Sequence, residues 1–183
     1  MIDSQQASQA LGEIEEVVGR VRQSRIYNIA SLIMIMWGVL VCAGNIATYL
    51  WPSYGNYVWI AVYVVGIMGS VAISARVHSR VGVRTFDLRL LTAFLLFVAF
   101  GFFCAILLGH FTPRQQGTFW PIYFMLFYSI AGLWFGHAFV AIGLGISALT
   151  LFGYFYIGAA FPLWMAFVNG GGLIVGGLWM RRS

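Results

Sequence analysis

Charged residues are scarce in this chain of 183 residues. Asp, Glu, Lys and Arg make up only 8% of it and lysine is absent, whereas 61% of the residues are hydrophobic. A soluble domain carries about 25% charged residues. A soluble core of this size does not hide so much apolar surface, so the composition predicts an integral membrane protein whose first partner is the lipid bilayer. The net charge of +5 does not indicate nucleic-acid binding, because the arginines lie beside apolar segments, as topology signals do.

The sequence also lacks the residue patterns that carry chemistry. Its two cysteines, Cys42 and Cys104, form neither a CxxC nor a CxxH spacing, which favours thiols packed as small hydrophobic side chains. No charged residue lies inside an apolar run, although cation-coupled transporters usually keep ionisable groups at mid-depth. Because we find no nucleophile–base pair, phosphate-binding loop or metal-ligand spacing, we expect no enzymatic activity, no cofactor and no metal.

Long apolar runs are what the sequence has in abundance. A spanning helix needs about 20 apolar residues, and six runs qualify, at roughly 27–50, 57–75, 89–110, 119–135, 139–157 and 161–180. The fourth and fifth runs are separated only by FGHAF at 135–139. A single helix over both would be about 60 Å long, twice the hydrocarbon thickness, so we expect a break there. The fold class predicted for 26–183 is an all-α, polytopic integral membrane bundle of six transmembrane helices.

The arginines indicate the topology of this bundle. With the N-terminus in the cytoplasm, nine of the ten arginines fall on the cytoplasmic side and only Arg114 lies outside. Five spans would move Arg181 and Arg182 to the outside and remove the asymmetry. The sequence therefore predicts a multi-pass protein of the cell (inner) membrane with both termini cytoplasmic. Trp37 lies near the middle of the first run, so its indole N–H needs a partner within the bundle.

The segment 1–25 has a different pattern. Ala7, Leu11, Ile14, Val18 and Val21 alternate at spacings of four and three residues, which is typical of a helix–helix seam. We call these five residues the N-terminal seam. The pattern predicts a cytoplasmic amphipathic helix that lies on the membrane face, pairs with its twin in a dimer, or binds another protein. Its glutamates weigh against the membrane face, because surface helices are usually basic toward anionic lipid.

Glycines form the main motif of the C-terminal half. GLWFG at 132–136, AIGLG at 141–145 and GLIVG at 172–176 each place small residues four apart, which lets helices approach closely. We predict that this half packs more tightly than the first half or forms the contact in an oligomer. The predicted helix-packing residues are Gly132, Gly136, Gly145, Gly172 and Gly176.

The sequence NGGG at 169–172 allows a second interpretation. Asn169, Gly170 and Gly171 could form a hinge or an unwound segment that exposes backbone groups to a solute, as in transporters with broken helices. His110 and Arg114 would then form a cationic outer mouth for an anion. His110 and His137 are expected on opposite faces of the membrane, so together they cannot ligate one haem.

Two functional hypotheses follow. The first is a non-enzymatic multi-pass membrane protein that acts through helix association, either with itself or as an accessory subunit of a larger membrane complex. The alternative is a small channel or uncoupled transporter for a neutral, hydrophobic or anionic solute. The lack of intramembrane charge, the N-terminal seam and the glycine motifs favour the first.

Overall fold

The computed structural model describes residues 4–79, 88–109 and 111–182. Within these ranges the chain consists of helices joined by short turns and contains no strand. The C-terminal helix is continuous but has three parts, α6, η2 and α7, which we together call the last helix. The elements are α1 (Ser4–Leu50), η1 (Pro52–Tyr54), α2 (Gly55–Ser79), α3 (Leu88–Leu107), α4 (Pro113–Phe135), α5 (His137–Tyr156), α6 (Phe161–Met165), η2 (Ala166–Gly171) and α7 (Gly172–Arg182).

Five helical stretches of the described chain are long and apolar enough to cross a membrane, which indicates a multi-pass membrane protein as the composition predicted. The apolar part of α3, Thr92–Leu107, is shorter than a full span. The sixth crossing therefore stays a prediction. The five stretches are Tyr27–Leu50, Pro52–Arg76, Pro113–Phe135, His137–Tyr156 and Phe161–Arg182.

The predicted break within the long apolar region is confirmed, and one residue makes it. Gly136 lies between the end of α4 and the start of α5 with a φ of 133°, a region that side-chain-bearing residues rarely adopt. Its N–H donates to the carbonyl of Gly132 at 3.0 Å. Gly136, one of the predicted helix-packing residues, reverses the chain direction between the two helices.

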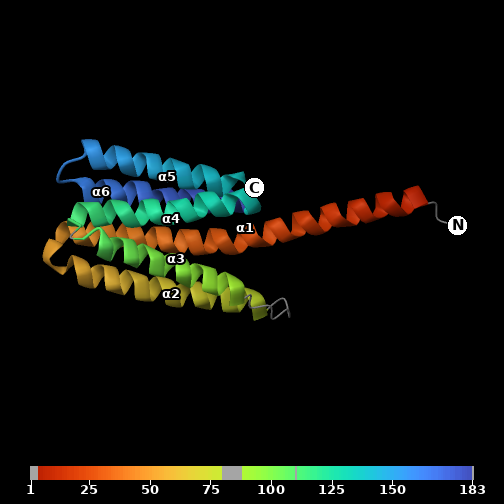
Figure 1. The fold of residues 1–183 in the computed structure, drawn as a ribbon, viewed down its shortest axis with the longest axis horizontal. Helices are drawn as coiled ribbons and strands as arrows, with labels where there is room; N and C mark the ends of the chain where they lie inside the picture. The colour runs from red at the N-terminus through yellow and green to blue at the C-terminus, as the bar shows by residue number, and fades with distance from the viewer. Residues whose placement is uncertain (1–3, 80–87, 110, 183) are drawn as a thin grey trace.

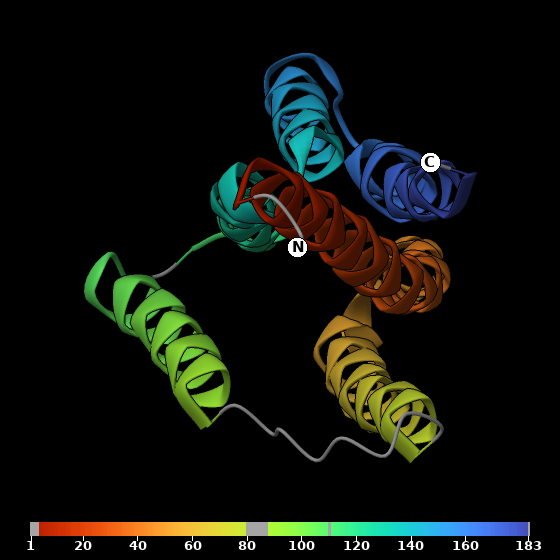
Figure 2. The same cartoon turned by 90° about the vertical axis from the view of Figure 1, so that its right-hand side faces the viewer.

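The helices run alternately in opposite directions, and they are packed unequally (Figure 1). The last helix lies against α1 and α5, and α5 packs along α4. Half of the most apolar stretch of the last helix is buried, against 11% for Pro52–Arg76. Figure 2 shows α5 and the last helix on one side of α1 and α4, and α2 and α3 on the opposite side, apart from each other. The tightest packing thus joins α1 to the C-terminal helices, around a core of Met34, Met125, Phe139, Ile142, Ile146, Leu173 and Met180.

Trp37 has the partner that its depth requires. Its indole N–H donates to Ser70 Oγ on α2 at 3.0 Å, and Ser70 donates in turn to the carbonyl of Gly66 at 2.8 Å. A Cβ on Gly66 would lie 2.5 Å from the Trp37 ring. Glycine at 66 therefore lets α2 approach the indole closely enough for the hydrogen bond.

The N-terminal segment is part of α1 and not a separate helix. α1 is unbroken from Ser4 to Leu50, 47 residues, and its first half projects beyond all the other helices (Figure 1). The side chains of the N-terminal seam lie outside the described part of the structure, so the amphipathic character of this segment stays a prediction.

Candidate functional site

The glycine-rich last helix is wedged between α1 and α5, and its glycines divide between the two contacts. A Cβ on Gly170 would lie 2.8 Å from the backbone nitrogen of Cys42, and one on Gly177 would lie 2.8 Å from the Ser31 carbonyl. On α1, Gly38 faces the last helix, since a Cβ on Gly38 would lie 2.8 Å from the Gly170 carbonyl. These backbone-to-backbone distances leave no room for any side chain, so glycine sets the spacing of α1 and the last helix.

The other face of the last helix uses the GLIVG motif against α5. A Cβ on Gly172 would lie 3.0 Å from Ile146, and one on Gly176 would lie 2.8 Å from Ile142. Gly171, between the two faces, would meet nothing within 4 Å. Gly172 and Gly176 therefore pack on a neighbouring helix, while Gly171 does not.

The contact between α4 and α5 uses one predicted glycine and one that sequence reasoning missed. A Cβ on Gly132 would lie 2.7 Å from the backbone nitrogen of Val140. On α5 the close residue is Gly143, whose Cβ would lie 2.7 Å from the Met125 carbonyl, whereas Gly145 is exposed and meets nothing within 4 Å. Gly143 lies in the same AIGLG motif and four residues after Phe139, but the sequence alone does not indicate which of the two glycines faces α4.

The segment around Asn169 is neither unwound nor regular. Ala166–Gly171 is π-helical, a wider turn that often marks functional positions. Met165, Asn169 and Leu173 are buried at steps of four residues, so they share one face of the last helix. The Asn169 side chain is 6% exposed, and its Oδ1 has no hydrogen-bond partner among the described residues. The proposed hinge at Gly170 is instead packed against α1.

A second buried oxygen lies at a similar level of the bundle. Thr150 Oγ1 has no hydrogen-bond partner among the described residues either, and its side chain is 0% exposed. Gly172 packs on Ile146, and the Trp164 indole donates to the Leu149 carbonyl at 2.9 Å. Thr150 follows Leu149 directly and lies about one turn of α5 beyond Ile146, so it is next to the second of these contacts. Each unpaired oxygen costs about 1–3 kcal/mol of desolvation.

The side chain of Arg114 binds backbone carbonyls at the C-terminal end of α5. Its Nη2 donates to the carbonyls of Tyr154 and Ile157 and, at 3.4 Å, to that of Gly153. The guanidinium also lies 5.4 Å from the Tyr154 ring and 5.3 Å from the Phe161 ring. A cation at the last carbonyls of a helix satisfies acceptors that have no intrahelical donor and complements the helix dipole. Arg114 thus fastens α4 to α5, while His110 lies outside the described residues.

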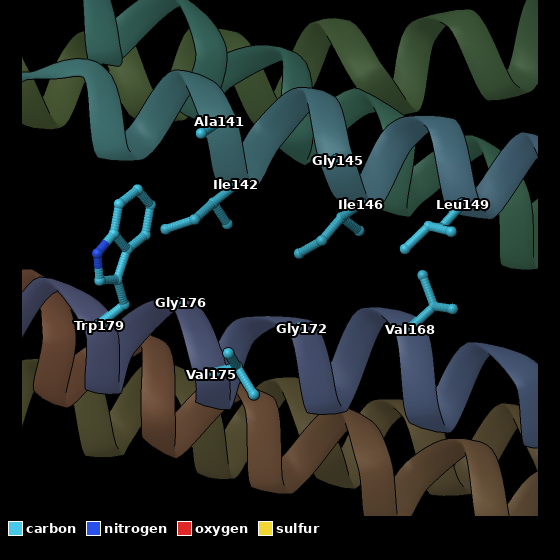
Figure 3. Close-up of a pocket in the computed structure, with 10 residues that line it drawn as sticks. All are labelled: Ala141, Ile142, Gly145, Ile146, Leu149, Val168, Gly172, Val175, Gly176 and Trp179. Atoms are coloured by element: carbon cyan, nitrogen blue, oxygen red, sulfur yellow. The ribbon is translucent and has the colours of Figure 1, made fainter.

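An apolar groove runs along the surface between α5 and the last helix (Figure 3). It measures about 300 Å³, and the side chains of Ile142, Ile146 and Val168 project into it, with Trp179 at one end. Gly145, which no other helix covers, leaves space on the α5 side. The lining residues are Ala141, Ile142, Gly145, Ile146, Leu149, Val168, Gly172, Val175, Gly176 and Trp179.

No group of three or more His, Cys, Asp or Glu side chains that could hold a metal ion occurs in the part of the chain that the structure describes. Comparison with protein families, with curated proteins and with solved structures finds no match to this chain.

Proposed function

We propose that this chain is a six-span membrane protein, with both termini cytoplasmic, that acts through helix association and not through catalysis. The observation that carries the proposal is the apolar face of α2. Ile60, Val64, Ile67 and Val71 are all exposed, at alternating spacings of four, three and four residues. Their spacing places them along one side of the helix, as in seams between packed helices. A second copy or another membrane protein would cover this face.

The sixth crossing is supported by the length and partner of α3. Its 20 residues give a helix about 30 Å long, the thickness of the hydrocarbon core. Phe97 of α3 stacks on Tyr123 of α4 with ring centroids 4.2 Å apart, and Tyr123 donates its hydroxyl to the Phe97 carbonyl at 2.7 Å. A sixth crossing also keeps nine of the ten arginines on one side.

The N-terminal part of α1 supports association as well. Because it continues the first span without a break, it leaves the bundle as a rod (Figure 1). The part before Tyr27 would be about 35 Å long at 1.5 Å per residue. A rod that continues a spanning helix projects away from the bilayer and does not lie along its surface. This direction favours pairing with a twin helix or binding to another protein.

Transport is the second candidate, and the two unpaired oxygens favour it. Thr150 Oγ1 and Asn169 Oδ1 are buried acceptors without donors among the described residues, as a polar solute site requires. Neither residue lines the groove between α5 and the last helix, and Gly170 is packed against α1. The association proposal needs no such path and therefore accounts for more of the described contacts.

Photo-crosslinking in lipid tests the association proposal. A photoreactive amino acid replaces Ile67 on the α2 face or, as the matched control, Leu144 on α5, which is similarly exposed (57% and 59%). In native membranes we expect the probe at position 67 to crosslink the chain to another polypeptide, and the probe at position 144 to form no crosslink to protein. Adducts of twice the chain mass identify a homo-oligomer, and larger unequal adducts identify another subunit.

A mass measurement in lipid nanodiscs completes the experiment. The proposal expects a particle with more than one polypeptide when the full chain is purified with its partners. A single chain per particle, together with no protein crosslink from position 67, would refute association and leave transport as the remaining hypothesis.

A further inference from the structure

We propose that the groove between α5 and the last helix binds one acyl chain of an anionic phospholipid, with the lipid phosphate held at the end where α5 begins and α7 ends. This inference requires only that the chain lies in a membrane. It does not depend on association through α2.

The groove has the size and chemistry for an acyl chain. Its lining side chains are those of Ala, Ile, Leu, Val and Trp, with three glycines. A groove of about 300 Å³ far exceeds the roughly 10–15 Å³ that a cavity needs to hold one water, so it has room for several methylene groups. The groove opens at the side of the bundle (Figure 3), where lipid tails surround a membrane protein.

The end of the groove near Trp179 is basic on both sides. On α5, His137, Ala141 and Gly145 are four residues apart, so His137 continues one wall of the groove beyond Ala141. On α7, Val175, Trp179 and Arg182 stand at i, i+4 and i+7, so Arg182 continues the other wall. His137 and Arg182 are both exposed. A phosphate at this end would meet both side chains.

The amino end of α5 adds to this attraction. α5 has 20 residues, and its N-cap, Gly136, makes no side-chain hydrogen bond to the first turn. The N–H groups of a first turn without such a cap carry partial positive charge and bind anions. The Phe139 N–H already donates to the Gly136 carbonyl at 3.2 Å, so an anionic headgroup would meet the first-turn N–H groups that precede it.

Charge decides between a lipid and a second copy of the chain. A second copy with its helix in the groove, in the same orientation to the membrane, would bring its own Arg181 and Arg182 to the same depth as those already there. Anionic lipids carry the complementary charge, and basic pockets between spanning helices are known sites for their headgroups. The groove therefore suits an anionic phospholipid better than a symmetric partner.

Native mass spectrometry of the full chain tests the headgroup half of the proposal. Phosphatidylglycerol and phosphatidylcholine with identical acyl chains are titrated onto the detergent-solubilised protein. We expect phosphatidylglycerol to bind about five-fold more tightly, the effect of about one basic residue near an anionic lipid. Arg182→Gln should remove most of this preference. Arg181→Gln is the matched control and should keep it, because Arg181 follows Gly177 by four residues and lies on the α1 side.

The acyl-chain half is tested by filling the groove. Gly145→Leu adds a side chain where a Cβ meets nothing, so the fold should tolerate it, and binding of both lipids should weaken several-fold. Ala99→Leu adds similar bulk at an exposed position of α3, away from the groove, and should leave binding unchanged. Equal affinities for the two lipids, or equal losses in Arg181→Gln and Arg182→Gln, would overturn the proposal. A Gly145→Leu protein that keeps its lipid but dissociates into single chains would show that a second copy occupies the groove, which also overturns it.

Discussion

Thr118 and Thr150 are both buried threonines in the bundle, but they differ in hydrogen bonding. Thr118 Oγ1 donates to the Arg114 carbonyl at 2.9 Å, whereas Thr150 Oγ1 has no partner among the described residues. Replacing an unpaired hydroxyl by a methyl group of the same shape removes a polar atom that gains nothing from burial. We therefore expect Thr150→Val to be neutral or to stabilise the protein by about 1 kcal/mol.

The control is Thr118→Val, which removes a hydrogen bond and should destabilise the protein by about 0.5–1.5 kcal/mol. The measurement is the free energy of unfolding in mixed micelles. A loss at Thr150 equal to that at Thr118 would mean that the Thr150 hydroxyl has a partner in the membrane, and it would strengthen the transport hypothesis.

At the level of helices, glycine position determines which pairs come close. Gly170 and Gly171 are adjacent, yet a Cβ on Gly170 meets the Cα and nitrogen of Cys42 at 2.8 Å, and one on Gly171 meets nothing. Backbone atoms cannot turn aside as a side chain can. Gly170→Ala should therefore separate α1 from the last helix and destabilise the protein by about 1–3 kcal/mol.

Gly171→Ala is the matched control for this prediction. It should be neutral or stabilise the last helix by up to about 1 kcal/mol, because alanine has the higher helix propensity. Thermal unfolding of both variants in the same detergent gives the comparison. If the two variants were equally destabilised, the spacing of α1 and the last helix would not depend on Gly170.

The sequence predicts where the helices lie better than how each is rotated. Apolar runs gave the spans that the structure shows, and a glycine with a polar neighbour gave the break at Gly136. Rotation is harder because these helices are apolar on most sides, so no polar face indicates which side points outward. The motif at 141–145 pointed to Gly145, but Gly143 makes the close contact with α4.

Contacts between distant parts of the chain explain the features that the sequence does not predict. The partners of Arg114 lie 39 to 43 residues further along the chain. The π-helical turn at Ala166–Gly171 ends in Asn169, Gly170 and Gly171, which are poor α-helix formers, so the local sequence favours an irregular helix there but does not specify a π turn. The groove depends on two helix faces at once and becomes visible only when α5 and the last helix are placed together.

At the scale of the whole molecule, the compact part and the extended parts differ in how they are packed. α1, α4, α5 and the last helix share one core, whereas the exposed face of α2 and the N-terminal rod lie outside it. Under the proposed topology the α2 face lies among lipid tails, whereas the rod leaves the bilayer and would meet water. Its seam of apolar residues therefore also needs another helix to cover it.

The N-terminal seam gives the last prediction. Leu11→Asp combined with Val18→Asp places two carboxylates where paired rods would bury apolar side chains. Each buried carboxylate costs more than about 1.4 kcal/mol, so self-association in a detergent dilution series should weaken at least tenfold. Ser8→Asp combined with Gln23→Asp adds the same charge off the seam and should leave the mass distribution unchanged. If the seam variant associates as the unmodified chain does, the rods do not pair with each other. The rod would then serve to bind a different protein, which co-purification with the unmodified chain but not with the seam variant would reveal.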